Sequence, residues 1–168
     1  MLFSFGNWNL ESKAEKHLTK YYDSEVILSE GQPFYDGKIY RMLHNSDFVY
    51  IGKSRSKFEH FDFMVLFDET KTIKLVKVLV YRENYGGEIG SKRWLRQFIG
   101  LNKPKPFVDA ISGATISVHS IKNSINTLLT KLWNIKKMVG ATYTIIEDIK
   151  VMCTKLKKKE NGKLSILN

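Results

Sequence analysis

Small and hydroxyl-bearing residues gather in one stretch, residues 109–120, which reads DAISGATISVHS and leads into the clearest helical pattern of the chain. The first N–H groups of a helix have no partner within the helix, and the helix dipole favours an anion there. Gly113 lets the backbone approach a ligand closely, and Ala114 adds almost no bulk. Three hydroxyls surround the same point, those of Ser112, Thr115 and Ser117. The stretch fits a phosphate site, although Ser, Thr and Gly also begin helices simply by capping them.

A second stretch, residues 81–100, reads YRENYGGEIGSKRWLRQFIG and holds three glycines within five residues. Such a run indicates a backbone that turns sharply or passes close to a flat ligand. A turn between a strand and a helix, without any ligand, explains it too. Ser91 is a suitable N-cap for a short helix over residues 92–99, with Gly100 as its end. Two aromatic residues four positions apart on that helix are expected to be core residues, Trp94 and Phe98.

The two stretches together resemble the FMN-binding domain family. Its pattern D-x-x-[S/T]-G-A-T is matched by Asp109, Ser112, Gly113, Ala114 and Thr115. Residues 81–100 are similar to the family's glycine-containing turn and the short helix that ends near Q-F-x-G, in the family's usual order and separation. The resemblance implies FMN as the cofactor, attached covalently through its phosphate to the hydroxyl of Thr115. It also implies that the turn lies near the flavin ring, with contacts from Tyr85, Gly87, Glu88 and Ile89, although the family more often has a P-G-L-G type sequence there.

The resemblance further implies an electron-transfer flavoprotein domain rather than a stand-alone catalyst, because the family includes subunits of bacterial ion-pumping respiratory complexes. A separate flavin transferase would attach FMN, and electrons would pass to a redox partner protein or a membrane complex. The implied location is extracytoplasmic or membrane-associated. The alternative is a module that binds FMN reversibly, or binds no cofactor, and docks on a membrane or an acidic partner through its basic tail.

Composition and charge limit the number of domains and the kinds of partner that the protein could bind. A length of 168 residues with 43% hydrophobic residues predicts one domain with a real core. The net charge is +10, and six of these charges come from residues 131–168, where nine lysines face three acidic residues. A solvated basic edge and attraction to an anionic membrane surface or acidic partner both explain this tail. No RRM, KH or helix-turn-helix pattern organises the basic residues, so nucleic-acid binding is not expected.

Several sequence features argue against other classes of protein. Cys153 is the only cysteine, which excludes an intrachain disulfide, and the four histidines lack metal-type spacing, so no metal site is expected. No apolar run reaches the length of a membrane-spanning helix. The apolar residues 1–10 lack a basic n-region, so they form no complete signal peptide; a trimmed export signal and a packed arm remain open.

The pattern of hydrophobic residues predicts a single α+β domain, an antiparallel sheet packed with helices. Residues 11–22 form an amphipathic helix with Ala14, Leu18 and Tyr22 on its apolar face, and residues 118–138 form a long one. Strands are expected at residues 26–28, 38–44, 47–53, 61–67 and 73–81, and their short connections favour antiparallel pairing. We expect an N-terminal arm and helix at 1–24, the FMN-binding domain at 25–140, and a basic extension packed on it at 141–168.

Overall fold

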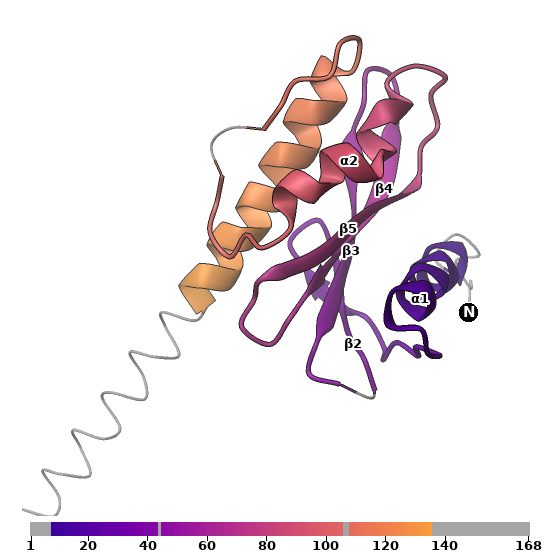
Figure 1. The fold of residues 1–168 in the computed structure, drawn as a ribbon, viewed down its shortest axis with the longest axis vertical. Helices are drawn as coiled ribbons and strands as arrows, with labels where there is room; N and C mark the ends of the chain where they lie inside the picture. The colour runs from indigo at the N-terminus through magenta and orange to yellow at the C-terminus, as the bar shows by residue number, and fades with distance from the viewer. Residues whose placement is uncertain (1–7, 44, 106–107, 136–168) are drawn as a thin grey trace, which may run out of the picture. The chain divides into compact units, whose positions relative to one another are not determined.

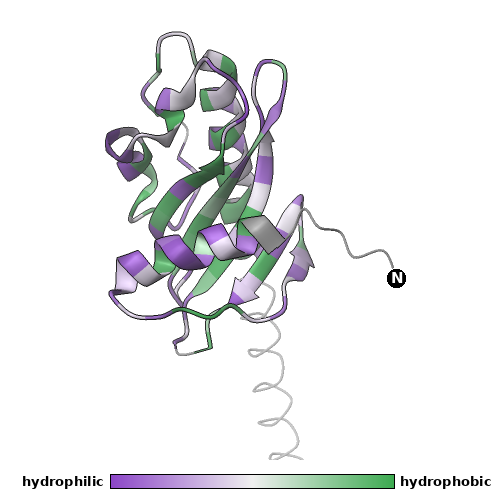
Figure 2. Cartoon of the chain, turned by 90° about the vertical axis from the view of Figure 1, so that its right-hand side faces the viewer, coloured by the Kyte–Doolittle hydropathy of each residue, from purple (hydrophilic) through white to green (hydrophobic). Residues whose placement is uncertain are grey.

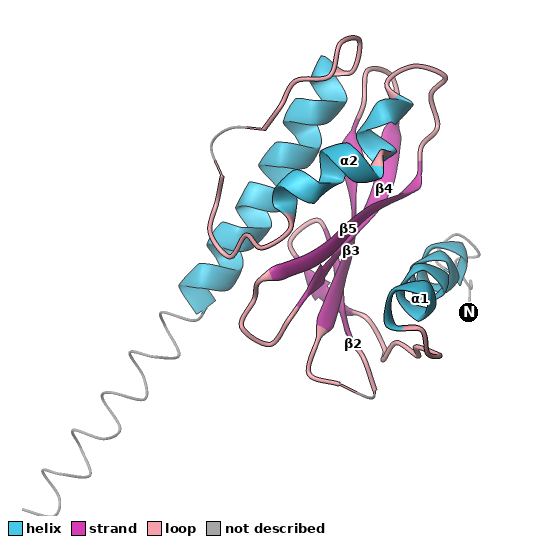
Figure 3. Cartoon of the chain, viewed as in Figure 1, coloured by secondary structure: helices cyan, strands magenta, loops and turns pink. Residues whose placement is uncertain are grey.

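The computed structural model describes residues 8–43, 45–105 and 108–135. It divides into a compact unit of residues 1–130 and a second unit of residues 131–168, and the first is described below. The elements in chain order are α1 (Trp8–Tyr22), β1 (Gln32–Phe34), β2 (Gly37–Arg41), β3 (Phe48–Arg55), β4 (His60–Phe67), β5 (Ile73–Val80), the 3-10 helix η1 (Gly87–Gly90), α2 (Lys92–Leu95) and the 3-10 helix η2 (Arg96–Phe98), shown in Figure 1 and Figure 3. A further helix, which we call the long helix, begins at Thr115 and continues to residue 135, where the described residues end.

The five strands form one sheet in the order β1-β2-β3-β4-β5, and each strand pairs with the next in an antiparallel sense. The cause is the length of the connections, because two to six residues can close a hairpin but cannot hold a helical crossover. Between β1 and β2 the chain reverses at Tyr35, whose φ of 54° lies in the left-handed region. The predicted α+β class, an antiparallel sheet packed with helices in a single domain, is confirmed.

Two of the strand predictions need correction. Residues 26–28 form no strand, and only Leu28 makes an isolated antiparallel bridge, to Met42. The segment is too short to offer a ladder, and Val26 is instead buried under α1. Conversely, β1 was not predicted, because Gln32 and Pro33 carry no strand signal. Proline is tolerated there because β1 lies at the edge of the sheet.

One face of the sheet is covered by α1. Ala14 and Leu18 are fully buried, as predicted for the apolar face of this helix. They pack in one cluster with residues from β3 and β4, namely Val49, Ile51, Met64 and Leu66. Figure 2 shows α1 crossing the strands, with hydrophilic residues over much of its visible surface and hydrophobic residues along the strands behind it. The helix begins at Trp8, three residues before the predicted start.

The opposite face of the sheet carries the long helix. Successive side chains of a strand point to opposite faces, so Tyr50 and Ser54 lie on the other side of β3 from Val49 and Ile51. The hydroxyl of Ser54 lies 2.9 Å from that of Ser120 and 2.8 Å from that of Ser124, both on the long helix. β4 is therefore covered on both faces, and every residue from Phe61 to Phe67 is buried.

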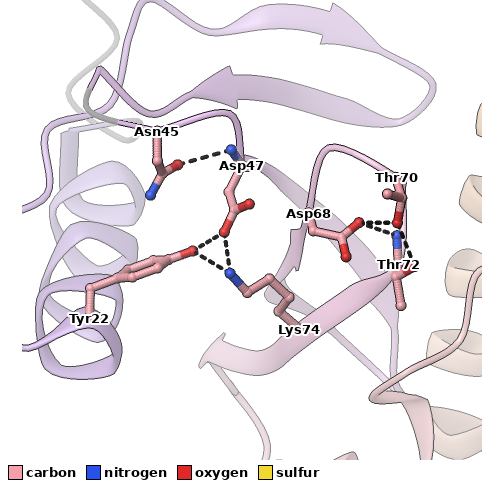
Figure 4. A network of polar contacts seen from close by, with 7 residues as sticks. All are labelled: Tyr22, Asn45, Asp47, Asp68, Thr70, Thr72 and Lys74. Carbon is pink, nitrogen blue, oxygen red and sulfur yellow. Dashed lines mark hydrogen bonds and ion pairs between the residues drawn. The ribbon is translucent and has the colours of Figure 1, made fainter.

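A polar cluster joins α1 to the sheet and gives the fold a predicted pH dependence (Figure 4). Asp47 accepts hydrogen bonds from the Tyr22 hydroxyl and the Lys74 ammonium. Burial, and after it the bond to Asp47, raises the pKa of Tyr22 from 10 to about 12. The bond to Asp47 likewise raises the pKa of Lys74. Both groups hold their protons more tightly in the folded state, so this stabilisation is complete below about pH 10 and is lost as the pH rises through about 12.

We expect Tyr22→Phe to lower the free energy of unfolding by about 1 kcal/mol at pH 8, a figure discounted for solvent exposure. The loss of stability of the wild-type chain between about pH 10 and about pH 12 should become shallower in this variant, because one of the two groups that release protons is gone. Urea unfolding at several pH values measures both effects. Tyr21→Phe, on the same helix with a 43% exposed side chain, is the matched control. Equal slopes for the wild type and Tyr22→Phe would contradict the assignment.

Candidate functional site

The glycine-rich turn and the loop before the long helix lie in direct contact. Gly86, at the entry to η1, has a φ of 78°. A Cβ atom at Gly86 would lie 3.2 Å from the Ala114 Cβ and 2.8 Å from the Tyr81 hydroxyl. Only glycine fits a backbone that is both left-handed and this close to its neighbours. The fold therefore brings together the two stretches that the sequence singled out.

Tyr81 holds this junction in place. It follows the last residue of β5, and its hydroxyl donates to the Tyr85 carbonyl oxygen at 2.8 Å. The same hydroxyl lies 3.1 Å from the Ser117 hydroxyl, in the first turn of the long helix. Ser117 is only 3% exposed, so its hydroxyl is committed to the protein interior. Sequence reasoning gave Tyr81 no role; the available signal was a tyrosine at the point where an apolar strand meets a glycine-rich turn.

The short helix α2 holds the beginning of the Asp109 motif. The indole Nε1–H of Trp94 donates to the Asp109 carbonyl oxygen at 2.8 Å, and the Asp109 N–H donates to Gln97 Oε1 at 2.8 Å. Ser91 caps α2, as predicted, by accepting a hydrogen bond from the Trp94 N–H at 3.4 Å. Trp94 and Phe98 are 6% and 0% exposed, which confirms them as core residues. The predicted helix over 92–99 is shorter than expected, because it tightens into η2 after Leu95.

The long helix begins without a side-chain cap. The Val118 N–H donates to the Ala114 carbonyl oxygen at 2.9 Å, which makes Ala114 the N-cap residue. A methyl group cannot accept a hydrogen bond, so the helix does not satisfy its own first amides in the way that Ser, Thr or Asp would. Across the described residues, no protein acceptor binds the N–H groups of Thr115, Ile116 or Ser117. Simple capping therefore does not explain the hydroxyl residues of this loop.

The loop that leads into the long helix has open space at Gly113. Gly113 has a φ of 81°, and a Cβ atom built there would meet nothing within 4 Å. Thr115 and Ser112 are both exposed. A phosphate group is an acceptor of the right charge for unpaired N–H groups at a helix N-terminus. The backbone and the Thr115 hydroxyl thus form a site that fits a phosphate.

A cleft of about 240 Å³ lies beside this loop, between α2 and the irregular segment around Asp109. Glu88, Asp109 and Ile111 are among its lining residues, together with Arg93 and Trp94. Tyr85 is 82% exposed, so its ring faces solvent at the junction, whereas Ile89 is fully buried and packs the turn from beneath. Gly87 is exposed on the same turn.

Two of the three cations in and next to the glycine-rich stretch, Arg82 and Lys92, lie away from this cleft. The Arg82 guanidinium donates to the His60 carbonyl oxygen at 2.7 Å and forms an ion pair with Asp62. Lys92 lines a different cleft, between α1 and α2. The third cation, Arg93, lines the cleft beside Asp109.

Residues 59–130 match a protein-family model described as FMN-binding domain. The chain contains an FMN-binding domain. The matched segment includes the glycine-rich turn, α2 and the Asp109 motif, and it ends within the long helix. The match indicates FMN as the cofactor. No curated protein and no solved structure matches the chain.

The FMN-binding domain has residues at this junction that suit each part of its cofactor. The uncapped amides and the open space at Gly113 suit the phosphate. The cleft beside Asp109 offers an aromatic residue, Trp94, and polar groups to a flat, partly polar ring. The individual contacts of the residues that the sequence singled out remain predictions.

No described helix is long and apolar enough to span a membrane. Among the described residues, no group of three or more His, Cys, Asp or Glu side chains is placed to hold a metal ion.

Proposed function

We propose that this FMN-binding domain carries FMN through a phosphoester to the Thr115 hydroxyl and serves in electron transfer. The observation that supports the proposal most strongly is the uncapped start of the long helix, where an exposed Thr115 hydroxyl lies beside amides that have no protein acceptor among the described residues. A side chain that only began a helix would itself bond to those amides. The residues instead leave them open to a phosphate.

The attachment is a post-translational step that this domain does not need to catalyse. A separate flavin transferase would take the FMN half from FAD. The Thr115 hydroxyl would supply the oxygen of the new bond to phosphorus and would lose its proton. The bond between the two phosphates of FAD would break, with AMP as the leaving group. An exposed Thr115 at the surface of the domain suits such an encounter with another protein.

The residues around the attachment point would then hold and orient the cofactor. The amides of Thr115 and Ile116 would bind phosphate oxygens, while the Trp94 and Gln97 bonds to Asp109 hold the start of the loop in place. The exposed ring of Tyr85 and the Arg93 guanidinium flank the cleft that would take the ring. Bound FMN supplies electron exchange in steps of one or two electrons. The electrons would pass to a redox partner protein or a membrane complex, in a membrane-associated or extracytoplasmic setting.

The absorbance spectrum of the protein isolated from its native host, before and after precipitation in acid, tests this function. We expect a flavin spectrum before precipitation and yellow colour that remains with the precipitated polypeptide. Free FMN in the supernatant would instead show reversible binding through the same residues. A colourless protein that takes up no FMN from solution would contradict the proposal and favour an interaction module whose basic tail, beyond residue 135, lies outside the described residues.

A further inference from the structure

A second cleft, of about 520 Å³, lies on the face of the sheet that carries α1. Its walls are α1 and the segment formed by α2 and η2, and β5 forms its floor. Lys77 pairs with Met64 across the ladder, and Leu75 pairs with Leu66, which places both β5 residues on the α1 face. The cleft shares no lining residue with the one beside Asp109. It is therefore a separate feature from the candidate flavin site.

This cleft is strongly basic. Five cations line it, and they come from four elements, α1, β5, α2 and η2: Lys16, Lys20, Lys77, Lys92 and Arg96. No Asp or Glu is among the lining residues. Within the described ranges none of the five cations forms an ion pair, in contrast to Lys74 and Arg82, which both do. The positive charge of the cleft is thus uncompensated by carboxylates of the domain.

Burial and the crowding of positive charges lower the pKa values of two groups that line the cleft. Burial, followed by the nearby charges of Lys77, Lys16 and Lys20, lowers the pKa of His17. Burial, followed by Lys92 and Lys20, lowers the pKa of Lys77. Like charges repel more strongly where they are partly removed from water. An anion in the cleft would relieve this repulsion.

The cleft also has an apolar part. Leu75, Val76 and Leu95 form its inner surface, and the side chains of Ile99 and Tyr21 are 45% and 43% exposed at its margin. A simple inorganic anion would use only the cations and leave these side chains in water. An apolar or aromatic body bound there would remove them from water.

We propose that this cleft binds a small amphipathic anion, whose apolar body contacts Leu75 and Ile99 and whose carboxylate, phosphate or sulfonate group contacts Lys20, Lys77 and Arg96. The volume lies in the range of small-molecule sites, about 300 to 1,000 Å³. A cleft of this volume is not needed for attraction to a flat lipid surface, which requires only exposed basic residues. The proposal is independent of FMN, because α1 and the floor residues lie outside the Asp109 junction.

Isothermal titration calorimetry of the full chain, with its flavin as isolated, tests the proposal with defined probes. The amphipathic anion is 8-anilinonaphthalene-1-sulfonate. The neutral analogue with the same rings is N-phenyl-1-naphthylamine, and inorganic phosphate is an anion without an apolar part. We expect saturable binding of the sulfonate at one site per chain. The neutral analogue and phosphate should each bind about tenfold more weakly or worse, because each lacks one of the two parts.

Matched triple variants locate the site. Lys20→Gln, Lys77→Gln and Arg96→Gln together should weaken sulfonate binding about tenfold or more. The control, Lys38→Gln, Lys53→Gln and Lys57→Gln, removes the same charge outside the cleft and should leave binding within about twofold of the wild type. The pKa of His17, measured by NMR, is a readout that needs no variant. A bound sulfonate should raise this pKa, because its negative charge would offset the positive charges around the imidazole. The titratable and charged groups that face His17 are Lys16, Lys20 and Tyr21 on α1, Lys77 on β5, and Lys92 and Arg96 across the cleft.

Equal weakening by both triple variants would overturn the proposal, as would a neutral analogue that binds as tightly as the sulfonate. Binding to anionic phospholipid vesicles without binding of the soluble sulfonate would also overturn it and would assign the cations to a membrane surface. An unchanged pKa of His17 at saturation would place the probe elsewhere. Retention of FMN is measured in the same samples, so failure of this site is distinguishable from failure of the flavin site.

Discussion

Thr115→Val is expected to lose all flavin that survives denaturation. The variant keeps the β-branched shape of the side chain and removes only the oxygen that would bond to the phosphate. Val carries no new charge, and residue 115 is exposed, so the fold should be unaffected. Thr115→Ser, which restores a hydroxyl at the same Cβ, should recover part of the bound flavin. In-gel flavin fluorescence of the denatured proteins, expressed with a flavin transferase, measures the effect.

Ser112→Ala provides the matched control for this prediction. Ser112 is an exposed hydroxyl residue of the same loop, three positions before Thr115 and outside the helix. Its loss should leave covalent flavin close to the wild-type amount, because the proposed phosphoester uses the hydroxyl of Thr115 and not that of Ser112. Flavin that stays with the denatured Thr115→Val chain would show that another residue carries the bond.

Gly86→Ala is expected to have the largest effect on the fold of the site, lowering the free energy of unfolding by about 3 kcal/mol. Part of the cost is the left-handed backbone, about 1–2 kcal/mol for a residue with a Cβ. The rest arises because the new methyl group would lie 2.8 Å from the Tyr81 hydroxyl and 3.2 Å from the Ala114 Cβ. Tyr81 must then move, and its contacts with Tyr85 and Ser117 are lost or weakened. We also expect poorer flavin retention.

Gly100→Ala separates the two causes. Gly100 has a φ of 83°, so alanine there has a similar backbone strain, but its Cβ would meet nothing within 4 Å. We expect a cost of about 1 kcal/mol and normal flavin retention, because only the strain applies. Denaturant unfolding of the two variants gives the comparison. If both variants lose the same stability and the same flavin, contact between Gly86 and Ala114 does not position the site.

The sequence predicted the elements whose pattern is set by burial. Residues 61–67 and 73–81 appeared as strands because β4 is covered on both faces and β5 packs against it. Ala14 and Leu18 showed the buried face of α1 for the same reason. β1 was missed, because an edge strand of three residues that contains Pro33 is held by backbone pairing and not by an apolar pattern. The start of the long helix was placed at residue 118 rather than 115, since Thr115 and Ile116 are exposed.

The site was predicted only as far as its motif. The Asp109 motif carried the resemblance that indicated FMN, and the family match bears out this cofactor. The parts that hold the motif depend on contacts between distant segments, such as the Tyr81 hydroxyl with Ser117 and the Trp94 indole with Asp109. No local pattern encodes such contacts. The basic cleft was missed for the same reason, because its cations lie on four separate elements, which only the fold brings together.

Mass spectrometry of the protein from its native host, or from a host that contains a flavin transferase, tests the central claim most directly. The peptide that spans residues 97–122 contains Thr115 together with Ser112, Ser117 and Ser120. The account predicts that this peptide gains the mass of FMN less one water and that fragmentation places the added mass on Thr115. An added flavin on a different residue, or an unmodified peptide from a protein that keeps its yellow colour after denaturation, would contradict it.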